Sequence, residues 1–106
     1  MPDARVNVPA SIPRGKPFEV RIIIRHPMET GYRTDESGKS IPRNVIRTFV
    51  CRYGGEPVFT ARLSSGIAAN PYLRFFVTAK ESGQLAFEWV DDNGVRGSDT
   101  ATLTVV

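Results

Sequence analysis

The chain has 106 residues, of which 41% are hydrophobic and 24% charged, and this size and composition are typical of one folded domain, residues 1–106. No stretch approaches the ~18 consecutive apolar residues of a membrane-spanning helix, so we expect no membrane partner. The formal net charge of +3 comes mainly from arginines that alternate singly with apolar residues, a pattern that argues against nucleic acid as a partner.

Alternation of apolar and polar residues predicts seven β-strands, separated by Gly, Pro and Asn. In chain order they span residues 4–8, 18–26, 45–53, 57–63, 72–79, 84–90 and 98–106. Gly54-Gly55 predicts a tight hairpin between the third and fourth strands, because glycine tolerates positive φ, and Asp-Asp-Asn-Gly at 91–94 predicts a turn before the last. The pattern predicts an all-β immunoglobulin-like β-sandwich, with a partly open barrel as the competing architecture.

A long segment of charged residues, Gly, Ser and Pro separates the second strand from the third, over residues 26–44. Loops of this length are uncommon in a compact domain, and they are usually either disordered or functional. The sequence leaves both possibilities open at this point.

Several apolar side chains fall on strand faces that the alternation predicts to be exposed. They are Ile23, Val58, Tyr72 and Phe76, with Met28 and Tyr32 nearby in the long loop. An apolar cluster ringed by arginine is typical of a protein–protein interface, whereas scattered exposure or a twisted core is the alternative interpretation.

No residue pattern predicts a catalytic or metal site. His26, the only histidine, ends a strand, and we expect it to hydrogen-bond loop backbone. Cys51, the only cysteine, lies on an apolar strand face, where we expect a buried, unreactive thiol. Glu-Ser-Gly-Lys-Ser at 36–40 lacks the upstream glycine of a phosphate-binding loop. We therefore expect neither an enzyme nor a bound cofactor.

Four segments of the chain are similar to the SoxZ family, the small subunit of the SoxYZ sulfur carrier. They are residues 25–46, 49–59, 69–75 and 82–94. The most specific parts are His-Pro-Met-Glu-Thr-Gly at 26–31 and Asn-Pro-Tyr at 70–72, and the Trp-Val-Asp-Asp-Asn-Gly element at 89–94 supports them.

The resemblance implies an immunoglobulin-like fold and a heterodimer with SoxY. In this family SoxY carries thiosulfate-derived sulfur on a cysteine in a flexible C-terminal segment, while other Sox enzymes oxidise and hydrolyse it. The present sequence ends without such a segment, so the resemblance implies the companion and not the carrier. Its N-terminus lacks the pattern of a secretory signal, which agrees with export to the periplasm together with SoxY.

The interface with SoxY is expected to use residues of the long loop and of the exposed apolar cluster. The candidate residues are Ile23, Arg25, His26, Met28, Tyr32, Arg33, Arg43, Tyr72 and Phe76. Met28 and Tyr32 are expected to supply apolar contact, and the loop arginines to attract an acidic partner or the anionic thiosulfonate. Two alternatives stay open: a self-associating sandwich, and a redox or sulfur-transfer role for Cys51. Separately, a SoxZ-like chain is expected to be able to form homodimers when SoxY is absent.

Overall fold

A computed structural model describes residues 4–64, 67 and 69–106 of the chain. The strands are β1 (Ala4–Asn7), β2 (Pro17–Ile24), β3 (Ile46–Tyr53), β4 (Glu56–Arg62), β5 (Tyr72–Thr78), β6 (Gly83–Asp91) and β7 (Arg96–Leu103). All seven predicted strands are confirmed, each boundary within three residues of the expected position. Within the part of the chain that is described, no helix is long and apolar enough to cross a membrane.

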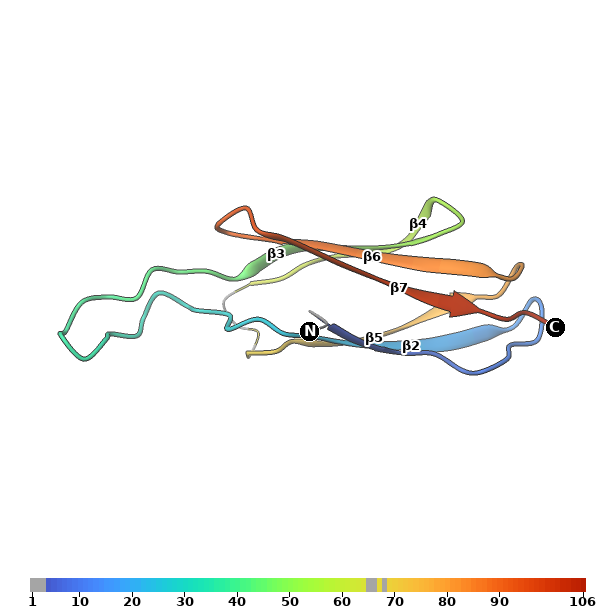
Figure 1. Ribbon diagram of the computed structural model, residues 1–106, viewed down its shortest axis with the longest axis horizontal. Helices are drawn as coiled ribbons and strands as arrows, with labels where there is room; N and C mark the ends of the chain where they lie inside the picture. Colours follow the sequence, from blue (N-terminus) through green and yellow to red (C-terminus); the bar gives the residue numbers. More distant parts are fainter. Residues whose placement is uncertain (1–3, 65–66, 68) are drawn as a thin grey trace.

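The strands form two antiparallel sheets that face each other as the layers of a sandwich (Figure 1). One sheet has the order β1-β2-β5 and the other the order β4-β3-β6-β7. The predicted immunoglobulin-like sandwich is confirmed, and the competing barrel is wrong because the strands pair in two separate sheets.

The core lies between the sheets and is built by the alternating residues of the central strands. On β2, Phe18, Val20, Ile22 and Ile24 are buried while the residues between them are more exposed. The core also contains an aromatic cluster, in which the rings of Phe59 and Phe75 stack 4.1 Å apart across the two sheets. Burying each such side chain contributes about 2 kcal/mol, so this pattern fixes which face of each strand points inward.

The start of β3 departs from simple alternation, because the register with β6 shifts between Ile46 and Thr48. As a result both Val45 and Ile46 are fully buried, although the alternation predicted only Val45 to point inward. The shift brings the end of the long loop beside the turn that joins β6 to β7, where Asp92 N–H donates to the Val45 carbonyl at 3.0 Å.

The long loop is a hairpin, and it projects beyond one end of the sandwich (Figure 1). We call residues 29–44 the hairpin loop. Glu29 and Asn44 exchange two backbone hydrogen bonds of 2.8 Å at its base, and Thr34 and Ser40 form a bridge near its tip. Because it leaves β2 and returns to β3, the hairpin loop also connects one sheet to the other.

Candidate functional site

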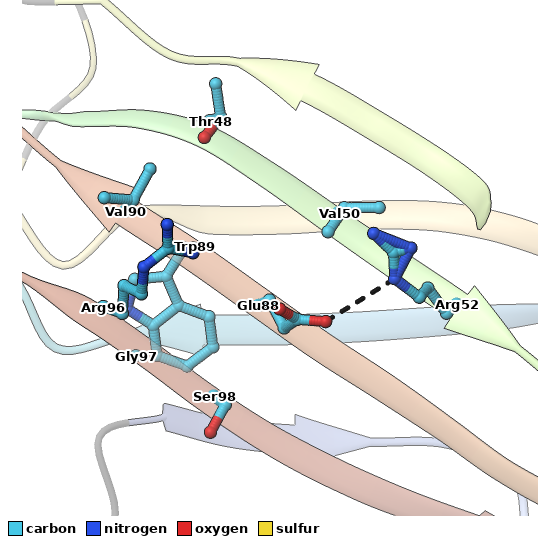
Figure 2. A pocket seen from close by; sticks show the side chains of 9 residues that line it. All are labelled: Thr48, Val50, Arg52, Glu88, Trp89, Val90, Arg96, Gly97 and Ser98. Carbon is cyan, nitrogen blue, oxygen red and sulfur yellow. Dashed lines mark ion pairs between the residues drawn. The ribbon is translucent and has the colours of Figure 1, made fainter. Parts of the chain in front are cut away.

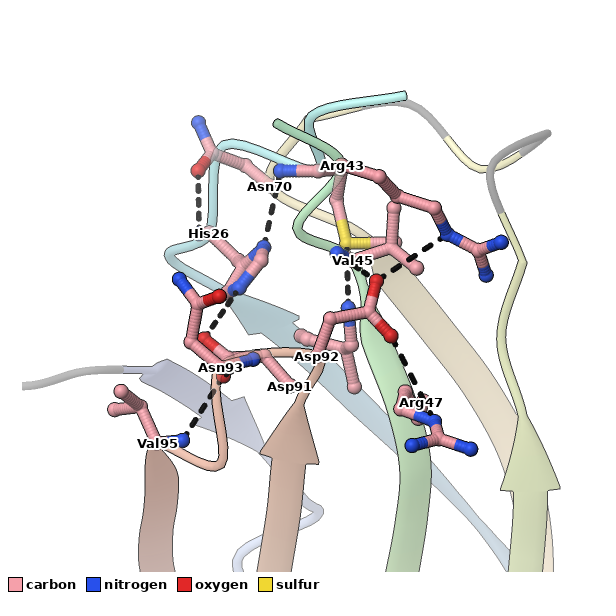
Figure 3. A network of polar contacts seen from close by, with 11 residues as sticks. His26, Arg43, Val45, Arg47, Asn70, Asp91, Asp92, Asn93 and Val95 are labelled. Carbon is pink, nitrogen blue, oxygen red and sulfur yellow. Dashed lines mark hydrogen bonds and ion pairs between the residues drawn. The ribbon is translucent and has the colours of Figure 1, made fainter. Parts of the chain in front are cut away.

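The base of the hairpin loop is held by a network centred on His26 (Figure 3). The Nδ1 atom of His26 accepts a hydrogen bond from the Met28 backbone N–H at 3.0 Å, so this nitrogen carries no proton. The other ring nitrogen, Nε2, therefore carries the proton and donates to Asp91 Oδ2 at 3.1 Å. The expectation that His26 bonds loop backbone is confirmed.

Asn70 attaches the segment before β5 to the same histidine. The Asn70 side-chain oxygen accepts from the His26 backbone N–H at 3.0 Å, and the Asn70 backbone N–H donates to the His26 carbonyl at 2.7 Å. This network brings together three segments that are far apart in the sequence (Figure 3). They are His-Pro-Met at 26–28, Asn-Pro-Tyr at 70–72 and the element at 89–94.

Asp91 is a buried carboxylate, 6% exposed, at the start of the turn between β6 and β7. Its burial works to raise its pKa, but hydrogen bonds from His26 and from the backbone N–H groups of Val95 and Asn93 outweigh burial and lower the pKa. Asp91 is therefore ionised at neutral pH, and its charge is satisfied both by the backbone of its own turn and by His26, which precedes the hairpin loop.

Asp92 ties the turn to the start of β3. Its Oδ2 atom accepts from the Val45 backbone N–H at 3.0 Å and lies 3.2 Å from Arg43 Nε, and its Oδ1 atom lies 3.7 Å from Arg47 Nε. The carboxylate stands between the two guanidinium groups (Figure 3). Arg43, expected to attract an anionic partner, is therefore already paired within the chain, with 55% of its side chain still exposed.

Met28 fills the space beneath the hairpin loop. It is 4% exposed, and its sulfur accepts the Ile46 backbone N–H at 3.3 Å. It also has a positive φ of 51°, a conformation that costs energy for a residue with a side chain and persists only when its surroundings hold it. Met28 and His26 thus lie inside this chain, whereas Tyr32 is 88% exposed.

The rest of the hairpin loop is stabilised by its own side chains. Arg33 forms a two-pronged ion pair with Glu29, with nitrogen–oxygen distances of 3.0 and 2.6 Å. At the tip, the Asp35 carboxylate accepts hydrogen bonds from the backbone N–H groups of Ser37 and Lys39. Those N–H groups are therefore occupied by a carboxylate of the same loop.

The exposed apolar residues of β2 and β5 lie together on the outer face of the three-stranded sheet. Ile23 is the register partner of Tyr72, and Phe76 follows Tyr72 on the same face of β5. Ile23 is 40% exposed, Tyr72 53% and Phe76 60%. We call these three residues the outer patch. On the same face, Arg5 of β1 lies opposite Ile23, and Arg21 and Arg74 are register partners on β2 and β5. Glu19 pairs with both Arg21 and Arg74.

The opposite face of the sandwich is more polar. A shallow hollow of about 330 Å³ lies on the four-stranded sheet, between Arg52, Glu88 and Arg96 (Figure 2). Glu88 pairs with Arg52 at 3.5 Å, and Trp89 packs over Gly97 in its wall. Thr48 and Ser98 add hydroxyl groups to the lining of this hollow.

Cys51 lies in the core on the central strand β3 and is fully buried, as expected. Burial raises the pKa of its thiol to about 12, so the reactive thiolate is scarce at neutral pH. Among the described residues, no three His, Cys, Asp or Glu side chains gather in a way that could hold a metal ion.

In a comparison with protein families, residues 6–102 match the family described as "Sulphur oxidation protein SoxZ". The chain belongs to the SoxZ family. Membership implies a role in Sox-dependent sulfur oxidation, in a family whose members are generally non-catalytic carrier subunits. None of the curated protein sequences matches the chain.

Several solved structures share the fold of this SoxZ-family chain. A superoxide reductase (neelaredoxin) from Ignicoccus hospitalis matches with a TM-score of 0.69 and 17% identity, over 97% of this chain and 80% of that one. The sulfur carrier protein SoxY from Chlorobium limicola f. thiosulfatophilum matches with a TM-score of 0.66 and 8% identity, over 98% of this chain and 79% of that one. At such low identities these likenesses show the fold alone.

Sequence reasoning placed Ile23, Tyr72 and Phe76 on exposed faces, and the structure puts them on one face of the three-stranded sheet, with Ile23 opposite Tyr72. It missed Asn44, Asn70, Asp91 and Asp92, which hold the base of the hairpin loop in this SoxZ-family chain. The available signal was that the segments most similar to SoxZ carry several of these residues, but alternation gives no information about contacts between distant turns.

Proposed function

We propose that this chain is the non-catalytic subunit of a SoxYZ sulfur carrier, a single domain that pairs with SoxY in the periplasm. SoxY would carry the sulfur intermediates covalently, and other Sox enzymes would reach this chain only through the complex. The observation that carries the pairing is the outer patch, where three large apolar side chains share one sheet face and stand beside arginines. Such a surface on a small protein favours a second subunit over solvent.

In this proposal the interface includes Ile23, Arg25, Tyr32, Arg33, Arg43, Tyr72 and Phe76. His26 and Met28 act from inside the chain, because they fix the direction in which the hairpin loop leaves the sandwich. The arginines keep a role in attracting an acidic surface, although Arg33 and Arg43 are each paired with a carboxylate of their own chain.

The division of labour can be tested by mass spectrometry of the native complex after treatment with thiosulfate. The complex is expected to contain one copy of each subunit, and the added sulfur mass should appear on SoxY alone. A mass increase on this chain would contradict the proposal and support the Cys51 alternative.

The outer patch can be tested with the double variant Tyr72→Ala/Phe76→Ala. Removing two exposed aromatic anchors should weaken binding to SoxY by about 2 kcal/mol or more, roughly 30-fold in Kd, measured by titration calorimetry. Val95→Ala is the matched control, because Val95 is 62% exposed on the turn between β6 and β7, away from the patch. Equal affinities for the two variants would show that the patch is not the interface.

A further inference from the structure

The strand that carries most of the outer patch, β5, lies at an edge of its sheet. In the order β1-β2-β5 it is paired with β2 on one side, and no other described strand is its neighbour. An edge strand presents a row of N–H and C=O groups that a further strand can bind.

The backbone groups that face this free edge can be identified from the ladder with β2. Ala79 N–H donates to the Lys16 carbonyl at 2.9 Å, and the Ala79 carbonyl accepts from Gly15 N–H at 2.8 Å. At the other end, the Pro71 carbonyl accepts from Ile24 N–H at 3.0 Å. Because hydrogen bonding in an antiparallel ladder alternates, residues 73, 75 and 77 also face β2. The N–H and C=O groups of Tyr72, Arg74, Phe76 and Thr78 therefore point away from β2, toward the free edge.

The other exposed edges carry features that discourage strand addition, and β5 does not. β4 contains Pro57 opposite an irregularity in its pairing with β3, and β1 is only four residues long. β7 contains Gly97 and the charged Asp99, and the segment that follows it, residues 104–106, is already hydrogen-bonded to residues 12–14. β5 has seven residues in unbroken register, without Pro, Gly or Lys. Such an edge is normally covered by another chain or becomes an aggregation site.

The side chains beside this edge define the partner strand that would fit. Arg74 lies between Tyr72 and Phe76 on the exposed face, with its guanidinium carbon 5.9 Å from the centre of the Phe76 ring. Arg21 is the register partner of Arg74, so two guanidinium groups share the single carboxylate of Glu19. A neighbouring strand with a carboxylate opposite Arg74 and apolar residues on either side would complement this order.

We propose that SoxY adds one of its strands, antiparallel, to the free edge of β5 and so continues the three-stranded sheet across the subunit boundary. The choice of partner rests on the proposed function, and the SoxY fold, which matches this chain's fold, has sheet edges to offer. A second copy of this chain fits less well. Pairing β5 with its own copy around Arg74 places the two arginines opposite or diagonal to each other, which is unfavourable for like charges.

The first test uses a proline at a position whose N–H faces only the free edge. Thr78→Pro removes that donor and leaves the hydrogen bonds to β2 intact, because Thr78 does not donate to β2. We expect its Kd for SoxY to rise about 10-fold or more, the effect of one lost hydrogen bond and of a blocked edge. Thr78→Ala is the control, since it keeps the N–H and should bind within about twofold of the original chain. Equal binding of the two variants would overturn the proposal.

The second test needs no variant and compares amide exchange, residue by residue, in the free chain and in the SoxY complex. The amides of Arg74, Phe76 and Thr78 should exchange quickly in the free chain and at least about 100-fold more slowly in the complex. The amides of Phe75 and Val77 should be protected in both states, because they face β2.

The outcomes separate this proposal from the proposed function. A complex in which the edge amides still exchange quickly would overturn strand addition and leave the SoxY pairing standing. Absence of any complex would remove both proposals. A dimer of this chain alone with the same amides protected, unchanged when SoxY is added, would show that the occupant is a second copy and not SoxY.

Discussion

The buried charged or polar side chains of the described residues are His26 and Asp91, and each satisfies the other. The histidine uses both ring nitrogens, one for Met28 N–H and one for Asp91, so its proton has a fixed place on Nε2. Loss of either residue would leave a buried group without its partner, at a cost of about 1–3 kcal/mol.

The lowered pKa of Asp91 makes stability depend on pH with a definite sign. A carboxyl whose pKa is lower in the folded than in the unfolded chain stabilises the fold above the unfolded value, about 4, and that contribution is lost as the pH falls through the lowered folded value. We expect Asp91→Asn to be less stable than the original chain by about 1–2 kcal/mol at pH 7, and the difference to shrink below pH 4.

Urea unfolding at a series of pH values measures this difference. Asp99→Asn serves as the control, because Asp99 lies on β7 and its carboxylate accepts the N–H of the neighbouring Thr100 and not a hydrogen bond from His26. A constant gap between Asp91→Asn and the original chain down to pH 2.5 (about 1.5 units below the unfolded value) would contradict the assignment.

At the scale of the strands, packing between β6 and β7 depends on one glycine. Trp89 is the register partner of Gly97, and a Cβ atom at Gly97 would come within 2.2 Å of the indole ring. The ring lies directly over the glycine in the wall of the hollow (Figure 2). A short residue at this point of β7 is therefore required by the size of its neighbour.

Gly97→Ala should force the indole of Trp89 out of its position and lower stability by about 2–3 kcal/mol, or roughly 10 °C or more in Tm. Gly83→Ala is the matched control, because Gly83 lies in the same β6–β7 pair, opposite Leu103, and a Cβ there meets nothing within 4 Å. Thermal unfolding of the two variants, followed by tryptophan fluorescence, compares them directly. Similar melting temperatures would mean that β7 can move aside.

The strands could be predicted from the sequence because burial of one face imposes a period of two, as Phe18, Val20, Ile22 and Ile24 illustrate. The hairpin loop could not, because it is held by reciprocal backbone bonds between Glu29 and Asn44 and by side chains contributed from other turns. The outer patch was predictable for the same reason as the strands. Ile23, Tyr72 and Phe76 are apolar residues at strand positions where the alternation predicts exposed, polar ones. The interior position of Met28 was not, because it follows from a positive φ and a register shift in β3.

For the molecule as a whole, the accessibility of Cys51 reports on global unfolding. Its strand, β3, lies between β4 and β6 in the larger sheet, and the sulfur faces the second sheet across the core. A reagent can reach it only when the two layers separate, so its reactivity measures how often the sandwich opens.

We expect a thiol reagent to modify Cys51 slowly in the native chain and quickly after denaturation. Added urea should raise the rate in parallel with the equilibrium constant for unfolding, since the same opening exposes the sulfur and most of the core. Rapid modification of the native protein, with no dependence on low urea, would revive the redox alternative.

The path of the hairpin loop between the two sheets has a structural consequence. Its tip, residues 33–40, is exposed throughout, while the contacts that hold the layers together lie at its base and in the core. A protease that cleaves the tip would therefore divide the polypeptide into a β1–β2 piece and a β3–β7 piece without disturbing a buried group. The smaller piece would remain attached through the pairing of β2 with β5. The domain would therefore stay folded after the polypeptide is cut at this point.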